Sequence, residues 1–505
     1  MHSSKIAFLP IPVFILTFVP FMPGCGVQAF SAESIQSGQI VLKFKDDLPP
    51  SQWESEQMLN RLGSQAQGHG LIRLEKPKRQ VALSTRSSRA AARMSRVFYG
   101  FLSSQSNRKA VLNWLQRHPS IEYAEPLYYH TLDVTPKDSL FVQQTHLPVV
   151  GLPDAWDRVQ GGQGSAVIAI VDGGTEIRHQ DLHGNLWVNE DEILGNNRDD
   201  DGNGYVDDVH GWNFATNSGD PTGLATQPDF ANHGTHTAGI ADALTDNVHG
   251  IAGAAWNCRL MAINAADRFG EGIAYGYEAM LYAAENGATI INCSWGRGGS
   301  PSQYEQDVIN YVTDLGAVVV ASAGNSGSTT LNYPACYSNV FAVAATNDWD
   351  AKTSFSTYGD WVDVSAPGLL IYSTVSNNGY ARYSGTSMSA PLTAGVIALI
   401  KTQHPEWSGR QCAEQVRVTA VSIDQLNPAY AGMLGKGRIH AGRAVTENPP
   451  SIRLNGAELV GDDGDSQFRP GETARIFLTL TNYLAPSADI SLSLSENSPY
   501  LSLLN

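Results

Sequence analysis

Three glycine-rich segments of the chain hold the side-chain types that nucleophilic acyl transfer requires. Asp172 begins the run DGG, His233 lies in NHGTHTAG, and Ser387 lies in GTSMSAP. This chemistry needs a hydroxyl, a base that takes its proton, and a carboxylate that orients the base. Glycines allow the close backbone approach that such sites use. Together the segments predict a catalytic Asp–His–Ser set, although each segment alone is commonly a turn or a helix cap.

The order Asp, His, Ser and the motifs HGTHTAG and GTSMSAP resemble the subtilisin-like serine proteases, the subtilase family. The resemblance covers roughly residues 138–444. It implies that Ser387 is the nucleophile, that His233 is the general base and then the general acid, and that Asp172 orients His233. The family places the catalytic imidazole first in HGTH, so His236 is expected to be structural.

The same resemblance assigns residues around the reacting carbonyl. Asn325 in AGNSG matches the family's oxyanion-hole amide, with the Ser387 backbone N–H as a second donor. An Asn in such a segment is otherwise a turn residue. Ser294, Trp295 and Gly296 resemble the family's substrate-lining wall, residues 270–272 resemble the opposite wall, and Gly324 is a further predicted substrate-binding residue. An extended peptide can pair with such backbone as an added strand, and Trp295 either bounds the side-chain pocket or packs inside its wall.

An acidic run between residues 199 and 208 predicts a calcium site. Oxygen ligands at alternate positions followed by Gly204 repeat the first half of an EF-hand loop. The alternative is a solvated acidic turn, but so many like charges repel one another without a cation. The predicted ligands are Asp199, Asp201, Asn203 and Asp207. The resemblance implies a second calcium site at Asp181 and Asn247, with Asp138 as a further candidate.

Strands that alternate with helices must position these clusters. Short, nearly continuous apolar runs suit strands buried on both faces of a sheet, and they lie at 165–171, 288–293, 317–321 and 340–345. Helical spacing occurs at 275–286, 303–315 and 388–403. The alternation predicts an α/β fold with a mainly parallel sheet flanked by helices and ligand sites beyond the carboxyl ends of the strands. The resemblance implies that this sheet is subtilisin-like.

The catalytic segment is expected to be one of four parts. Residues 1–29 have the cationic start and short apolar run of a signal peptide. Residues 33–135 are similar to the family's propeptides and are predicted to form a small α+β unit, with strands at 39–44 and 121–124 and a helix at 109–117. Residues 136–447 form the catalytic domain. Residues 450–505 predict a β-rich segment with strands at 476–481 and 490–494, which is either a truncated β-sandwich or a short appendage.

Charge is distributed unevenly along the 505-residue chain. The formal net charge is −16, but residues 33–135 carry +5 and residues 136–505 carry −22. The acidic total argues against nucleic acid as a partner, because phosphate binding needs clustered cations. The opposite charges predict that the propeptide docks on the catalytic body as folding assistant and inhibitor. Four cysteines remain after the signal segment, enough for one or two disulfides whose pairing stays open.

The sequence as a whole predicts a secreted or extracytoplasmic, calcium-stabilised serine endopeptidase made as a zymogen, with protein or peptide substrates. A stable membrane span is not expected, and lipid anchoring at Cys25 is the weaker alternative to secretion. Two other functions stay open. One is a catalytically silent protein that captures extended peptides, and the other is acyl transfer to an amine, as in a peptide ligase or cyclase.

Overall fold

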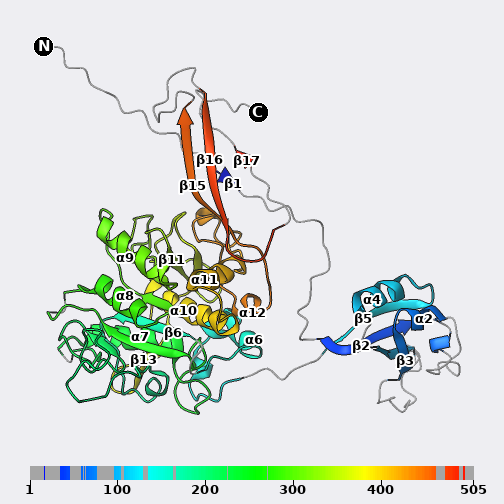
Figure 1. The fold of residues 1–505 in the computed structure, drawn as a ribbon, viewed down its shortest axis with the longest axis horizontal. Coiled ribbons are helices and arrows are strands. Elements are labelled where there is room, and N and C mark those ends of the chain that lie inside the picture. The colour runs from blue at the N-terminus through cyan, green and yellow to red at the C-terminus, as the bar shows by residue number, and fades with distance from the viewer. Residues whose placement is uncertain are drawn as a thin grey trace. The chain divides into compact units, whose positions relative to one another are not determined.

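The computed structural model describes residues 16–17, 35–45, 58–60, 62, 64–76, 96–103, 107–128, 135–162, 166–224, 226–269, 271–461, 473–487 and 493–494. Most of the predicted signal segment, Cys25 and residues 490–492 of a predicted strand lie outside these ranges. The chain divides into two compact units, one of residues 21–132 and one of residues 1–20 with 133–505 (Figure 1). None of the described helices is long and apolar enough to cross a membrane.

A seven-stranded sheet organises the larger unit, with the strand order β12-β11-β10-β9-β6-β8-β7. All of its neighbouring strands pair in parallel. The four predicted apolar runs form four of its strands, and this confirms the α/β fold. The strands are β6 (Val167–Asp172), β7 (Gly211–Asn213), β8 (Arg259–Asn264), β9 (Ile290–Cys293), β10 (Val318–Ser322), β11 (Val340–Thr346) and β12 (Val364–Pro367).

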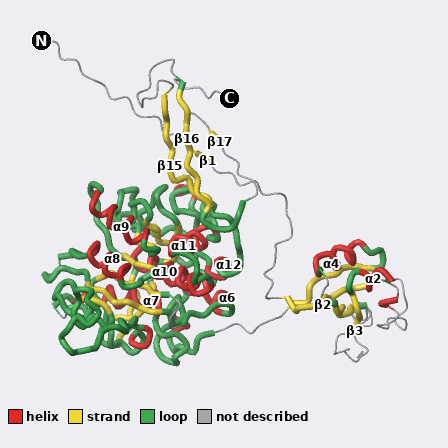
Figure 2. The backbone as a smooth tube through the Cα atoms, in the orientation of Figure 1, coloured by secondary structure: helices red, strands yellow, loops and turns green. Residues whose placement is uncertain are grey.

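Helices cover both faces of this sheet (Figures 1 and 2). Ile168 and Ile170 of β6 pack in one core with α7 and α10, whereas the alternate residues Ala169 and Val171 pack in a second core with α8 and α9. This alternation follows from the two-residue period of a strand and explains the continuous apolar runs. The helices are α5 (His146–Val149), α6 (Leu152–Trp156), α7 (Pro228–Asp242), α8 (Gly276–Glu285), α9 (Gln303–Asp314), α10 (Thr386–Gln403), α11 (Gly409–Val418) and α12 (Ala441–Ala444).

Antiparallel strand pairs complete this unit. β13 (Ile371–Val375) and β14 (Gly379–Tyr383) form a hairpin against α7. β15 (Ile452–Gly461) pairs with β16 (Ala474–Asn482), which contains the predicted strand at 476–481. β17 (Ser493–Leu494) pairs with β1 (Leu16–Thr17). The described part of the C-terminal segment is therefore β-rich, and completion of a sandwich stays a prediction.

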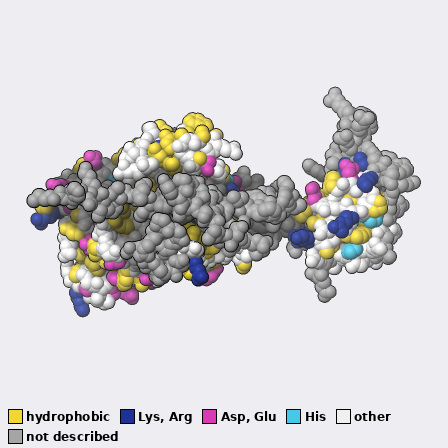
Figure 3. All heavy atoms as spheres, turned by 90° about the horizontal axis from the view of Figure 1, so that it is seen from above, with side chains coloured by type: hydrophobic (Ala, Val, Ile, Leu, Met, Phe, Trp, Pro, Cys, Tyr) yellow, Lys and Arg dark blue, Asp and Glu magenta, His cyan; other side chains and the backbone are white. Residues whose placement is uncertain are grey.

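The N-terminal unit is a small α+β fold, as its spacing predicts. Its four-stranded sheet has the order β3-β4-β2-β5, all antiparallel. Lys and Arg side chains lie on the face of this unit that Figure 3 shows. Its elements are β2 (Ile35–Phe44), α2 (Ser64–Gly68), β3 (Leu71–Glu75), β4 (Val97–Leu102), α4 (Arg108–Arg117) and β5 (Ile121–Tyr128).

No disulfide joins any two of the four described cysteines. Cys258, Cys293 and Cys412 are buried, and Cys336 is half-buried. The sequence allowed one or two disulfides among them, and the described residues form neither. These thiols act as small apolar side chains inside a core that is large enough to hold without cross-links.

Candidate active site

The three predicted catalytic residues come from separate elements of the larger unit. Asp172 is the last residue of β6, His233 lies in the first half of α7, and Ser387 is the second residue of α10. The carboxyl ends of parallel strands meet at one edge of a sheet, and that edge is where α/β folds place their sites.

A short hydrogen bond joins the first two of these residues. His233 Nδ1 lies 2.8 Å from Asp172 Oδ1. The buried carboxylate also accepts from the Gly173 N–H at 2.8 Å and from the Thr237 hydroxyl at 3.4 Å. Burial acts to lower the pKa of His233, but the charge and hydrogen bond of Asp172 outweigh it and raise this pKa above its usual value. The arrangement holds the ring with Nε2 available for proton transfer.

Two reciprocal hydrogen bonds join Ser387 to Ser294 of the predicted substrate wall. Its hydroxyl donates to the Ser294 carbonyl at 3.1 Å, and the Ser294 hydroxyl donates to the Ser387 carbonyl at 2.9 Å. Within the described part of the chain, the Ser387 hydroxyl therefore bonds Ser294 and not His233. Rotation about the serine Cα–Cβ bond redirects this hydroxyl, and catalytic hydrogen bonds commonly tighten only when substrate is bound.

The Asn325 side chain is held by its oxygen. Asn325 Oδ1 accepts from the Thr386 N–H at 3.0 Å and from the Thr386 hydroxyl at 3.1 Å. The same hydroxyl accepts from the Gly324 N–H at 3.1 Å, and Gly324 has a left-handed φ of +104° that favours glycine. Since the oxygen is occupied, the exposed Nδ2 is the end free to donate to an incoming group. The sequence analysis missed Thr386, although it is part of the motif GTSMSAP.

Two predicted substrate-binding glycines lie beside Asn332, a residue that was not among the predicted site residues. A Cβ on Gly296 would lie 2.3 Å from Asn332 Nδ2, and one on Gly324 would lie 3.1 Å from Asn332 Cγ. Asn332 Nδ2 donates to the Ser322 carbonyl at 3.2 Å. The half-buried Trp295 ring donates to the Val171 carbonyl at 2.8 Å. The segments of Gly296 and Gly324 are therefore brought together around the Asn332 side chain, and Trp295 is fixed next to Gly296.

His236 lies apart from this chemistry, as predicted. It is fully buried, and its Nε2 lies 3.1 Å from both the Ile371 and Ala381 carbonyls. Its ring stacks on Tyr383. Burial lowers the pKa of His236 to about 3, so the ring is neutral near pH 7 and braces β13 and β14 against α7.

Only part of the predicted calcium loop converges on one point. Carboxylate oxygens of Glu192, Asp201 and Asp208 lie within 4.8 Å of one another. The Asn203 side-chain amide donates to Asp201 at 3.0 Å and to Asp208 at 3.1 Å. The Asn189 amide also donates to both carboxylates. Burial and the charge of Asp201 raise the pKa of the Asp208 carboxyl. The three carboxylates of Glu192, Asp201 and Asp208 offer only oxygen ligands and place like charges close together, and such a set fits a calcium ion.

The structure places the other two predicted ligands elsewhere in the loop. Asp207 accepts from the backbone N–H groups of residues 195–197. Asp199 accepts from the N–H groups of Gly202 and Gly204. Both carboxylates are used to shape the turn. Glu192 and Asp208 replace them in the cluster, and the sequence spacing gave no reason to select Glu192.

The second predicted calcium site is assembled from distant segments. Asn247 Nδ2 donates to Asp181 Oδ1 at 2.8 Å, and Asp138 accepts from the Asp246 N–H at 2.8 Å and from the Asn247 N–H at 3.4 Å. Burial raises the pKa of Asp138 to about 6. The structure thus brings Asp138, Asp181 and Asn247 together, and the buried carboxylates of Asp138 and Asp181 are of the ligand type that calcium prefers.

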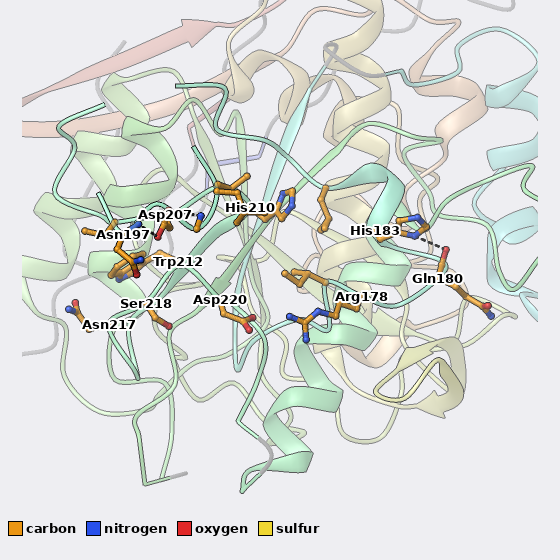
Figure 4. Close-up of a pocket in the computed structure, with 17 residues that line it drawn as sticks. Arg178, Gln180, His183, Asn197, Asp207, His210, Trp212, Asn217, Ser218 and Asp220 are labelled. Carbon is orange, nitrogen blue, oxygen red and sulfur yellow. Dashed lines mark hydrogen bonds between the residues drawn. The ribbon is translucent and has the colours of Figure 1, made fainter. Parts of the chain in front are cut away.

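A cavity of about 920 Å³ lies beside the acidic loop rather than at the catalytic residues (Figure 4). None of the predicted catalytic or substrate-wall residues lines it, whereas Asp207 does. Other polar residues of its lining are Arg178, His183, His210, Trp212 and Asp220.

The chain is similar in sequence to proteins of one known family. The model of the subtilase family matches residues 163–444. The chain is 39% identical over 342 residues to a thermophilic serine proteinase of Bacillus sp. (strain AK1), covering 67% of this chain and 76% of that protein. It is 40% identical over 316 residues to thermitase of Thermoactinomyces vulgaris, covering 62% of this chain and 99% of that protein. A solved protease structure from Pseudoalteromonas arctica aligns with a TM-score of 0.49 and 27% identity, over 62% of this chain and 99% of that chain. The chain therefore belongs to the subtilase family and is a serine-type endopeptidase.

Proposed function

We propose that Asp172, His233 and Ser387 hydrolyse peptide bonds of an extended substrate through an acyl-enzyme. The observation that carries this assignment is the 2.8 Å hydrogen bond between His233 Nδ1 and the buried Asp172 carboxylate. It orients the imidazole so that Nε2 can take the Ser387 proton. The assignment of the nucleophile is supported by the start of α10, which places the Ser387 backbone N–H at a helix N-terminus.

The chemical steps follow from these positions. Ser387 Oγ attacks the substrate carbonyl carbon while His233 takes its proton, and the carbonyl oxygen becomes an oxyanion. Asn325 Nδ2 and the Ser387 backbone N–H donate to that oxyanion. His233 then gives its proton to the leaving amine, and the Ser387 acyl ester remains. Water, deprotonated by His233, hydrolyses this ester and restores the hydroxyl.

The test is to incubate the mature protein with a serine-directed phosphonate and, separately, with a mixed peptide library. Peptide mapping should find the phosphonate on Ser387, and the library should yield hydrolysis products. The Ser387→Ala variant should give neither result. A protein that binds the peptides without labelling would be a silent binding protein, and joined peptides without hydrolysis would indicate acyl transfer. Either outcome would refute the endopeptidase assignment for this site.

Calcium is proposed at both oxygen-rich sites. Glu192, Asp201, Asp208 and Asn203 would hold one ion, and Asp138, Asp181 and Asn247 would hold the other. The bound ion would neutralise like charges and tie loops to the catalytic domain. This function is structural, and no proton or acyl step passes through the metal.

Secretion and zymogen processing complete the proposal. The cationic and apolar residues 1–29 support export, and the +5 charge of residues 33–135 against −22 for the remainder supports docking of a propeptide on the catalytic domain. Cleavage is proposed between residues 130 and 137, which would release the active enzyme.

A further inference from the structure

We propose that Glu305 is a positioning residue that fixes the pocket for the substrate side chain on the acyl side of the cleaved bond (P1), and so sets its selectivity. This inference rests on the proposed function, because it concerns the walls of that site. Glu305 lies on α9 and is outside both predicted walls.

A single carboxylate collects four hydrogen bonds at this position. The Glu305 side chain is 13% exposed, and it accepts from Arg297 Nη2 at 2.7 Å and Arg297 Nε at 3.1 Å. It also accepts from the Tyr337 hydroxyl at 2.6 Å and the Tyr277 hydroxyl at 3.0 Å. Bidentate, charge-assisted bonds of this kind are strong and geometrically specific. Burial favours the neutral acid, but the donors outweigh it and lower the pKa of Glu305 below its usual value.

Arg297 connects Glu305 to the segments of Gly296 and Gly324. It directly follows Gly296 of the first wall, and its backbone N–H and carbonyl pair with those of Tyr333 at 2.8 Å each. Tyr333 in turn follows Asn332, the side chain between Gly296 and Gly324. Movement of the guanidinium would therefore shift the backbone on both sides of Asn332.

The two tyrosines connect Glu305 to the same two segments through ring contacts. Tyr277 packs edge to face on Trp295, with ring centroids 5.8 Å apart. Tyr337 packs on Tyr333 with centroids 4.6 Å apart. All three donors to Glu305 thus contact residues in or next to the segments of Gly296 and Gly324. Segments held by several directed hydrogen bonds discriminate between side chains because they cannot relax around a poor fit.

The variant Glu305→Gln tests this inference with peptides that differ only at P1. The amide keeps the shape but loses the charge and one acceptor, while Arg297 keeps its bonds to the Gly298 and Ser300 carbonyls. We expect KM for the preferred P1 residue to rise about tenfold, the equivalent of one hydrogen bond. The kcat value should change about twofold or less, and the kcat/KM ratio between the best and worst P1 residues should fall by about the same factor of ten.

The matched control is Glu447→Gln. Glu447 also makes a bidentate pair, with Arg443 at 2.7 and 3.0 Å, but it lies next to α12 and away from the pocket. It should leave P1 selectivity unchanged. Tyr337→Phe removes one donor to Glu305 and should give a smaller loss of selectivity in the same direction.

Three outcomes would overturn the inference. They are unchanged P1 selectivity in Glu305→Gln, an equal loss in Glu447→Gln, and a uniform fall in kcat/KM for every P1 residue, which indicates general destabilisation. Failure of the proposed function is a separate result, because the wild-type protein would then not be labelled at Ser387 by the phosphonate.

Discussion

At the scale of single residues, orientation matters as much as identity. Asn325 can serve an oxyanion only through Nδ2, and the two bonds from Thr386 to Oδ1 impose that orientation. The orientation is set before substrate arrives, so it costs no reorganisation during the reaction.

Replacement of Asn325 by Leu should test this donor. We expect kcat to fall by about two to three orders of magnitude with little change in KM, the loss typical of removing this donor in the subtilisins. The donor contributes in the transition state and not in the ground state, so the two constants separate. Thr386→Val, which keeps the side-chain size but removes one anchor of Oδ1, should give a smaller fall in kcat. Steady-state kinetics measures both, and a rise in KM at constant kcat would contradict the oxyanion assignment.

The raised pKa of His233 predicts the acid limb of the activity profile. Catalysis needs the neutral ring, so kcat/KM should fall as pH drops through a value above the ordinary 6.5. Asp172→Asn removes the charge that raises this pKa. It should move the acid limb to lower pH and reduce kcat by about 10⁴, because the imidazole loses its orienting carboxylate.

A pH–rate profile of both proteins checks this expectation, and an unmoved acid limb in Asp172→Asn would contradict it. The ion pair between Asp172 and His233 also affects the free energy of unfolding, but with the opposite pH dependence. The stability that this pair adds is fully present below the pKa of an unfolded histidine, and it is lost as pH rises through the pKa of His233 in the folded protein.

At the scale of elements, a buried ionic cluster joins α11 to the C-terminal hairpin. The Glu414 side chain is fully buried and accepts from Arg417 at 2.7 Å and from the Ser451 hydroxyl at 2.6 Å. It also pairs with Arg453 of β15, whose guanidinium reaches Asp363 at 2.6 Å. The hairpin is therefore tied to the catalytic domain through charge as well as through the chain.

Glu414→Gln should destabilise this junction strongly. The change leaves buried guanidinium groups facing a neutral amide, and breaking one partner of such a cluster costs about 3–5 kcal/mol. Urea unfolding measures the loss. Glu406→Gln is the control, because Glu406 is 67% exposed and should change the unfolding free energy little. Equal small effects in the two variants would show that the cluster does not hold the hairpin.

Sequence patterns identified elements more securely than their ends or partners. The apolar run at 288–293 correctly indicated a buried strand, yet β9 begins at Ile290. Apolar runs and helical spacing depend on local periods, which one segment can display. The junction at Glu414 depends on residues that are dozens of positions apart, so no local pattern could indicate it.

At the scale of the whole molecule, calcium should link the loops to global stability. Chelation should lower the thermal midpoint by roughly 5–10 °C, since a saturated site adds about 2.7 kcal/mol at a hundred times its dissociation constant. Asp208→Asn should show a smaller chelator-induced shift, because it removes a buried ligand of the proposed site.

The matched control for the loop is Asp220→Asn. Asp220 is exposed and, among the described residues, its side chain bonds only the Thr222 N–H, so its variant should keep the full chelator-induced shift. Differential scanning calorimetry with and without chelator measures all three proteins. A midpoint that does not respond to chelation in the wild type would contradict the calcium proposal.

The zymogen proposal makes its own prediction. Ser387→Ala should accumulate with the N-terminal unit still attached, because self-cleavage needs the nucleophile, whereas the wild type should begin between residues 130 and 137. Sequencing the N-terminus of both secreted proteins checks this. Full activity in an unprocessed wild-type chain would contradict inhibition by residues 33–135.

The sequence by itself determined the types and order of the catalytic groups and the alternation of strands and helices, because each is written in a contiguous motif or a local period. The tertiary structure alone decided which side chains meet. It brought the carboxylates of Glu192 and Asp208 close to Asp201, formed no disulfide between the described cysteines, and gathered Arg297, Tyr277 and Tyr337 around Glu305. These outcomes depend on distances and burial between remote segments, which only the packed chain establishes.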